Sequence, residues 1–315
     1  MINIEIKSSN QTKLFGHDKL FLDIIDLYKN NKLPNKILFS GSKGVGKATF
    51  AYHLVNYILS KDELLNYDLI NFKINDLNKS FKHVLNNAHP NFYLIDLLDE
   101  KKVIEISQIR KMINYTNKSA FNNKERIILI DNAEYLNPSS SNALLKIVEE
   151  PNDNIIFIFI YDSSKKILDT VKSRCLKFNF SLTSRETLDI TNKILDEDIN
   201  TLISEDFISY YNSIGDLINL IKFSSSNKID ISKTNLKSFL LNVFENKLYK
   251  KDPYIKNNVF KLVELYLLKL LNLNKSNKKI FDIYHELINK IDSIKKFNLD
   301  EESIFIEMKT KLLDG

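Results

Sequence analysis

The segment from Gly41 to Thr49 has the residue types and spacing of a loop that binds phosphate groups. It reads Gly41-Ser42-Lys43-Gly44-Val45-Gly46-Lys47-Ala48-Thr49 and fits the pattern G-x-x-x-x-G-K. In such a loop, backbone N–H groups and the N-terminus of the next helix hold phosphate oxygens, and Lys47 reaches the β and γ phosphates. Half of the chain's six glycines fall between positions 41 and 46. Because glycine is used where backbone approaches a ligand closely, this crowding indicates a site.

One position of the loop departs from the pattern. The residue after the lysine is normally Ser or Thr, whose hydroxyl binds Mg²⁺, and here it is Ala48. Thr49 is adjacent but points about 100° further round the helix. We therefore predict a degenerate site for ATP or ADP, with Mg²⁺ present only if nucleotide binds, built from Gly41, Gly44, Val45, Gly46, Lys47, Ala48 and Thr49. The alternative is a tight strand-to-helix turn that binds no ligand.

An aspartate follows a short hydrophobic run further along the chain. The run 127–130 is Ile-Ile-Leu-Ile, and Asp131 comes next. An acidic residue at the end of a buried strand matches a Walker B strand, whose aspartate helps to hold Mg²⁺. Alone, it would be an ordinary strand-end aspartate that caps a turn. Paired with the upstream loop, Asp131 is assigned to the predicted nucleotide site.

The third candidate is the tripeptide Ser173-Arg174-Cys175. The chain has only four arginines, so each is a candidate for work that lysine cannot do. Arg174 could be a surface charge. It could also be an arginine finger offered to a nucleotide bound by a neighbouring subunit, because its planar fork pairs with phosphate at two points. We predict a catalytic role in trans for Arg174, with Ser173 beside it.

The elements that position these residues alternate between strand and helix. Five short apolar runs, at 37–40, 92–97, 126–130, 155–161 and 176–180, are separated by helical stretches. Such alternation predicts an α/β domain with a parallel sheet covered by helices on both faces. Beyond residue 180 the pattern is helical, and we expect one of these helices at 206–223. A polar linker is expected at 224–237.

Composition excludes several classes of protein. The chain has 315 residues, 43% of them hydrophobic, and 45 basic against 40 acidic residues give a net charge of +5. No apolar run approaches the ~18 residues that span a bilayer, and the first ten residues have no secretory pattern. A lone cysteine, Cys175, allows neither an internal disulfide nor a multi-cysteine zinc site. We expect a cytoplasmic protein with no zinc and no membrane contact.

The ordered motifs resemble a known family. Leu14-Phe15-Gly16-His17 precedes the loop, and His89-Pro90-Asn91 and Ile106-Ser107-Gln108-Ile109-Arg110 follow it. The likeness is strongest at Asn142-Ala143-Leu144-Leu145-Lys146 with Glu149-Glu150-Pro151, and at Ser173-Arg174-Cys175. The chain is similar, over about residues 10 to 180, to the δ′ subunits of bacterial DNA polymerase III clamp loaders, which are AAA+ proteins. Asn298-Leu299-Asp300 is similar to a C-terminal pattern of the same family.

The resemblance implies a domain organisation and a role. It implies a RecA-like AAA+ domain at 1–180, a helical lid at 181–237 and an all-α collar for oligomerisation at 238–315. It further implies a δ′-type subunit that works with γ/τ and δ subunits and a sliding clamp, and helps to load that clamp onto primed DNA. Such a subunit hydrolyses little or no ATP and offers an arginine, here Arg174, to its neighbour.

Departures from an active AAA+ ATPase support that role. The catalytic glutamate expected after Asp131 is replaced by Asn132, which cannot accept a proton from water, and the next carboxylate, Glu134, lies two positions further on. A lid arginine is expected near Gly215-Asp216-Leu217, but no arginine follows Arg185. Ala48 is the third missing group. Two alternatives remain. One is an active γ/τ-type ATPase, although the C-terminal region is too short for τ-type extensions, and the other is a P-loop kinase of small molecules.

Overall fold

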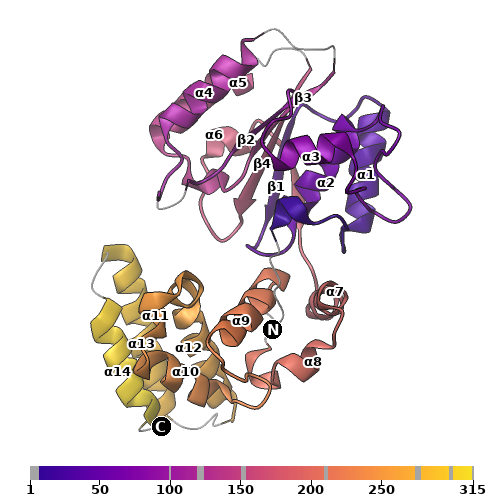
Figure 1. The fold of residues 1–315 in the computed structure, drawn as a ribbon. Coiled ribbons are helices and arrows are strands. Elements are labelled where there is room, and N and C mark those ends of the chain that lie inside the picture. The colour runs from indigo at the N-terminus through magenta and orange to yellow at the C-terminus, as the bar shows by residue number, and fades with distance from the viewer. Residues whose placement is uncertain are drawn as a thin grey trace. The chain divides into compact units, whose positions relative to one another are not determined.

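The computed structural model describes residues 7–98, 101–118, 124–149, 154–208, 212–273, 278–297 and 301–313. The chain divides into two compact units (Figure 1). The N-terminal unit comprises the described residues up to Ile190 together with Ser213–Gly215. The C-terminal unit comprises Thr191–Asn212 and the described residues from Asp216 onward. The predicted boundary at 237/238, between a lid and a collar, stays a prediction.

The N-terminal unit is built on a five-stranded parallel sheet. The strands are β1 (Lys36–Gly41), β2 (Phe92–Ile95), β3 (Arg126–Ile130), β4 (Ile155–Asp162) and β5 (Leu176–Phe180), in the order β2-β3-β4-β1-β5. The central strands are buried along almost their whole length, which is why the sequence shows them as continuous apolar runs. The predicted α/β class with a parallel sheet is confirmed.

Helices cover both faces of this sheet (Figure 1). One face packs against α1 (Asp18–Lys29), α2 (Lys47–Leu59) and α3 (Lys79–Leu85), and the other against α4 (Ile106–Thr116), α5 (Pro138–Glu149) and the short α6 (Asp169–Lys172). Two consecutive residues of β1 illustrate the division, because Phe39 belongs to the first core and Leu38 to the second. Short 3₁₀ turns occur at Ser8–Asn10 and Ala133–Tyr135.

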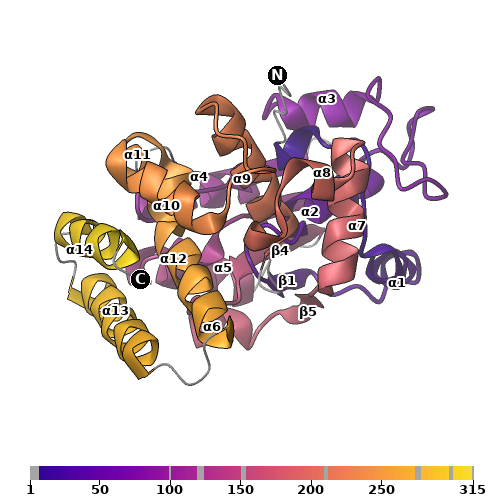
Figure 2. The same cartoon turned by 90° about the horizontal axis from the view of Figure 1, so that it is seen from below.

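The rest of the described chain is helical. The helices are α7 (Ser184–Leu195), α8 (Ile199–Leu202), α9 (Ile214–Ser226), α10 (Leu236–Glu245), α11 (Leu248–Lys251), α12 (Pro253–Leu273), α13 (Lys278–Phe297) and α14 (Glu301–Leu313). Helices α10 to α14 pack against one another (Figure 2). The predicted change from a mixed to an all-helical pattern near residue 180 is confirmed. No helix within the described ranges has the length and apolar character to cross a membrane.

The helix predicted at 206–223 is wrong in its first half. Residues Glu205–Phe207 form a 3₁₀ turn, and α9 begins only at Ile214. Tertiary contacts hold the turn, because Ser204 N–H donates to the carbonyl of Ile231 at 2.9 Å, and Leu236 N–H donates to the Asp206 carboxylate at 3.3 Å. These bonds are non-local, so periodicity alone could not indicate them. Glu150, Pro151 and the Asn298–Asp300 motif lie outside the described residues.

Candidate functional site

The glycine-rich loop joins the end of β1 to the start of α2, as its sequence predicts. Gly44 and Gly46 have φ angles of 82° and 100°, in the left-handed region that favours glycine. Gly41 is required for a different reason: a Cβ atom there would lie 2.4 Å from the carbonyl oxygen of Phe180 on β5. The backbone therefore needs glycine at each of these positions, and the helix N-terminus follows directly at Lys47.

Lys47 is buried at the base of this loop. Its ammonium group donates to the carbonyl oxygens of Gly41 and Ser42, both at 2.7 Å. Burial lowers the pKa of Lys47, and the carboxylates of Asp162 and Asp131 oppose that shift. The loop thus has a single buried cation, surrounded by backbone dipoles and close to acidic side chains.

Carboxylates from two neighbouring strand ends lie around Lys47. Burial, and then the charge of Asp96, raise the pKa of Asp131 to about 6, while Lys47 acts in the opposite direction. Glu134, whose side chain is 4% exposed, accepts a hydrogen bond from the backbone N–H of Asp162 at 3.2 Å. The sequence pointed to Asp131 only. Asp162 could also have been assigned to the site from the sequence, because it directly follows a predicted strand and the carboxyl ends of parallel strands meet at one edge of the sheet.

The two positions that depart from an active site have partners of their own. The methyl group of Ala48 packs against the hydrophobic core on the α2 face of the sheet. The side-chain amide of Asn132 donates to Asp96, which follows β2, at 2.7 Å. Among the described residues, no group of three or more His, Cys, Asp or Glu side chains has the arrangement of a metal site.

Arg174 and Ser173 belong to a separate part of the N-terminal unit, at the end of α6. The guanidinium donates through Nη1 to the carbonyl of Thr170 at 2.9 Å and pairs through Nη2 with Glu149 at 2.8 Å. The Ser173 hydroxyl also donates to Thr170, at 3.3 Å. The Arg174 side chain is 36% exposed. Within the described residues, no hydrogen bond or ion pair joins Arg174 to the glycine loop.

Two sequence motifs that are far apart in the chain line the same groove. Arg110 at the end of its motif on α4, and Asn142 and Lys146 on α5, face a cavity of about 470 Å³. Its remaining wall is formed by Ile106, Ile113, Ser139, Ala143 and Ile147. Two of the polar lining side chains are cationic, so the groove carries positive charge. The sequence identified both motifs but gave no sign that they meet.

Residues at the start of α9 contact the loop. Gly215, which groups with the N-terminal unit, donates its N–H to the carbonyl of Gly44 at 3.0 Å. A Cβ atom on Gly44 would lie 3.0 Å from the Cα atom of Gly215, so the two backbones require a small residue at both positions. The sequence analysis used Gly215 only to mark the place where a lid arginine was expected.

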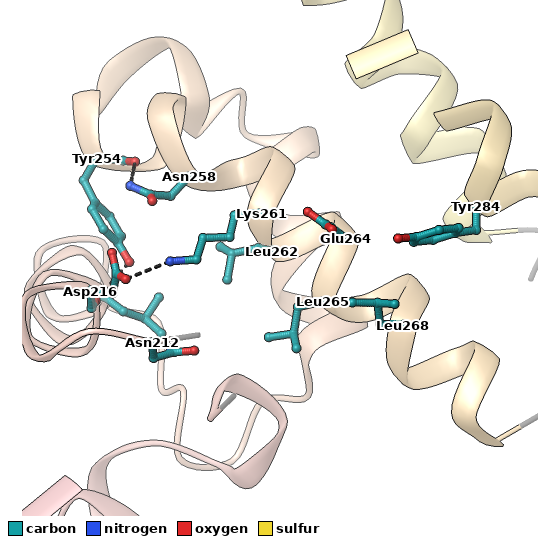
Figure 3. Close-up of a pocket in the computed structure, with 11 residues that line it drawn as sticks. Asn212, Asp216, Tyr254, Asn258, Lys261, Leu262, Glu264, Leu265, Leu268 and Tyr284 are labelled. Atoms are coloured by element: carbon teal, nitrogen blue, oxygen red, sulfur yellow. Dashed lines mark hydrogen bonds and ion pairs between the residues drawn. The ribbon is translucent and has the colours of Figure 1, made fainter. Parts of the chain in front are cut away.

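A second cavity, of about 410 Å³, lies inside the C-terminal unit (Figure 3). Lys261 on α12 pairs with Asp216 on α9 at 2.8 Å, and the Tyr254 hydroxyl donates to the Asp216 carbonyl at 3.1 Å. Glu264 and Tyr284 line the opposite part of the cavity. Nothing in the sequence pointed to this cavity, because its lining residues come from three separate helices and from Asn212, which precedes α9.

The sheet order, the loop geometry and the ordered motifs can now be compared with known proteins. The family described as DNA polymerase III, delta subunit, matches residues 16–184, which is more than half of the chain. The chain belongs to this family. It is a member of the DNA polymerase III clamp-loader proteins, as its motifs led us to expect.

Relatives within this clamp-loader family carry two kinds of subunit name. The chain is 28% identical to the DNA polymerase III subunit gamma of Buchnera aphidicola over 311 residues, 94% of this chain and 74% of that protein. It is also 28% identical to the subunit delta′ of the same organism over 284 residues, 89% of this chain and 81% of that protein. Against the gamma/tau subunit of Mycoplasma genitalium it is 28% identical, and the match covers only 37% of that longer protein. These similarities establish the family without separating the two subunit types.

Proposed function

We propose that this chain is a δ′-type subunit of a DNA polymerase III clamp loader. In this role it assembles in the cytoplasm with γ/τ and δ subunits and helps to load the sliding clamp onto primed DNA. It hydrolyses little or no ATP itself, and Arg174 acts on the nucleotide of the neighbouring subunit. The glycine loop is suited to hold the phosphate groups of ATP or ADP, and Mg²⁺ would be present only together with the nucleotide.

One observation carries this proposal: the loop keeps its phosphate-binding form, while the residues at two positions important for hydrolysis are replaced and make structural contacts instead. Gly44 and Gly46 hold the loop conformation, and Lys47 lies at its base. Ala48, in place of a Mg²⁺-binding hydroxyl, packs against the core, and Asn132 is bonded to Asp96. A site of this composition can bind phosphate groups but has no base at the usual place to activate water.

The second candidate is an active γ/τ-type ATPase. It is favoured by the match to the gamma subunit of Buchnera aphidicola over 94% of this chain, and by the carboxylates of Glu134 and Asp162 near Lys47. A carboxylate from either residue could take over the role of the missing glutamate. The two candidates predict opposite results for the purified chain.

Two measurements test the proposal. The full chain is co-expressed with the γ/τ and δ subunits of its own organism, and we expect one stable complex to purify. The ATPase activity of the chain alone is then compared with that of its Lys47→Ala variant, and we expect both at background. Turnover by the chain alone that Lys47→Ala abolishes would establish the γ/τ-type candidate, and failure to enter the complex would contradict both.

A further inference from the structure

Arg174 makes two short contacts and one longer contact, with Ser173 at 3.4 Å, within its own subunit. Its Nη1 donates to the carbonyl of Thr170 on α6, and its Nη2 pairs with Oε1 of Glu149 at the end of α5. A guanidinium group has five N–H donors in one plane, so these two contacts leave other donors of the fork for a further partner. The side chain is 36% exposed, so this partner can approach from solvent.

The backbone at Glu149 has a contact with the first strand of the sheet. Its backbone carbonyl accepts a hydrogen bond from the Lys36 ammonium at 3.4 Å, at the start of β1. Helix α5 also packs against α6, the helix that supplies the Thr170 carbonyl. The carboxylate is 49% exposed, so it contacts Arg174 from the surface and does not bury it.

We propose that Glu149 is a positioning residue that holds the guanidinium plane of Arg174 in the orientation needed to meet a phosphate group of a neighbouring subunit. This inference rests on the proposed function, in which Arg174 acts in trans. An arginine side chain that is already ordered loses less rotamer freedom when it binds phosphate. Thr170 and Glu149 together fix the plane at two points, and loss of Glu149 leaves only the contact with Thr170 and a weak one with Ser173.

The expected size of the effect separates positioning from catalysis. Exposed ion pairs are weak, so loss of Glu149 should reduce the turnover number by about two- to fivefold. Loss of an arginine finger reduces turnover by as much as ~10³-fold. The Glu149 carboxylate pairs with Arg174, so in this proposal its effect on turnover passes through Arg174.

The test uses the reconstituted complex of full-length subunits. ATP turnover and KM are measured with Glu149→Ala, Glu149→Gln, Arg174→Ala and the double variant Glu149→Ala/Arg174→Ala. We expect Glu149→Ala to lower kcat and to leave KM for ATP unchanged, because the nucleotide is bound by the neighbour. Glu149→Gln should recover most of the activity, because its amide oxygen still accepts from Nη2. A matched control is Asp62→Ala, which removes another exposed ion pair, with Lys124 at 2.7 Å, and should have no effect.

The double variant distinguishes positioning from general destabilisation. In the Arg174→Ala background, loss of Glu149 should cause no further decrease in kcat. An equal decrease in both backgrounds would overturn the inference, and so would unchanged or higher turnover in Glu149→Ala, which would make Glu149 irrelevant or inhibitory. If Arg174→Ala itself leaves turnover unchanged, the proposed function is wrong. If Arg174→Ala lowers turnover as expected but Glu149→Ala does not, only the positioning role of Glu149 is rejected.

Discussion

The side-chain amide of Asn132 donates a hydrogen bond to Oδ1 of Asp96 across the ends of β3 and β2, at 2.7 Å. Asn132 occupies the position where an active ATPase of this class carries a glutamate. The amide is matched to the carboxylate because one donates and the other accepts. A carboxylate at position 132 would instead face a second carboxylate.

Asn132→Glu should therefore lower stability without creating ATPase activity. Two carboxylates at this distance repel each other, and a lost bond to a charged group costs about 1.5–3 kcal/mol in the free energy of unfolding. The double variant Asp96→Asn/Asn132→Glu restores a donor and an acceptor and should regain the electrostatic part of the lost stability, although the left-handed backbone at position 132 still disfavours glutamate. Urea unfolding at pH 7.5 provides the measurement. Equal stability of the single and double variants would show that the pair is unimportant.

Asp131→Asn should make the protein more stable at neutral pH. The pKa of Asp131 is raised to about 6, above that of an aspartate in the unfolded chain, so its charged form is unfavourable in the folded state. Its contribution to stability is present at low pH and is lost as the pH rises to about 6. Removing the charge should raise the free energy of unfolding at pH 7.5 by roughly 1–3 kcal/mol.

Asp68→Asn is the matched control for this change. The pKa of Asp68 is lowered by hydrogen bonds from the side chain and backbone N–H of Asn71, so its charged form is favoured. The variant should be less stable at pH 7.5, and its deficit should shrink as the pH falls. If both aspartate variants shift the urea midpoint in the same direction, the electrostatic explanation for Asp131 is wrong.

Acid should destabilise the protein through His53. This buried ring donates from Nε2 to the Gln11 carbonyl at 3.0 Å, and its Nδ1 accepts from the Tyr67 hydroxyl at 2.8 Å, which requires the neutral form. Burial lowers the pKa of His53 to about 4. The unfolded chain therefore binds more protons below pH ~6.5, and stability falls as the pH is lowered from there towards 4.

The variant His53→Gln isolates this contribution. It should be less stable than the parent at pH 7.5, where both hydrogen bonds of the ring are intact. The difference between the two proteins should narrow at lower pH by up to ~1.4 kcal/mol per pH unit. Urea midpoints measured from pH 7.5 to 4.5 give the comparison. A difference that does not change with pH would exclude His53 as a titrating group. His89, whose pKa is also lowered to about 4, acts equally in both proteins.

Two glycine substitutions in the loop should differ in severity. A Cβ atom at position 41 would lie 2.4 Å from a backbone oxygen of β5, so Gly41→Ala must displace a strand. Gly46 has φ of 100° but open space around it, so Gly46→Ala is opposed only by the backbone conformation, at about 1–3 kcal/mol. Thermal unfolding should rank Gly41→Ala as the less stable variant, and the reverse order would contradict the strand contact.

Local features of this chain could be predicted from the sequence, and long-range ones could not. The loop between β1 and α2 follows from the spacing of its glycines, and the strands follow from uninterrupted apolar runs. Asp162 could have been assigned because it directly follows the predicted strand 155–161, whereas the contact of Asp96 with Asn132 depends on the order of strands in the sheet, which non-local pairing sets. The contact of Arg174 with Glu149 was missed for the same reason, since the two residues are 25 positions apart in the chain.

The contacts of Lys47 also affect how strongly the loop can bind any ligand. Two carbonyl oxygens of the loop's own backbone already hold its ammonium group. An incoming phosphate must exchange with these oxygens, so the loop contains a tethered competitor whose effective concentration is fixed by the fold. The observed free energy of binding is then the difference between the state in which Lys47 contacts phosphate and the state in which it contacts the two carbonyl oxygens. In the proposed nucleotide-binding role, this exchange lowers the affinity of the loop for phosphate even with every glycine and Lys47 in place.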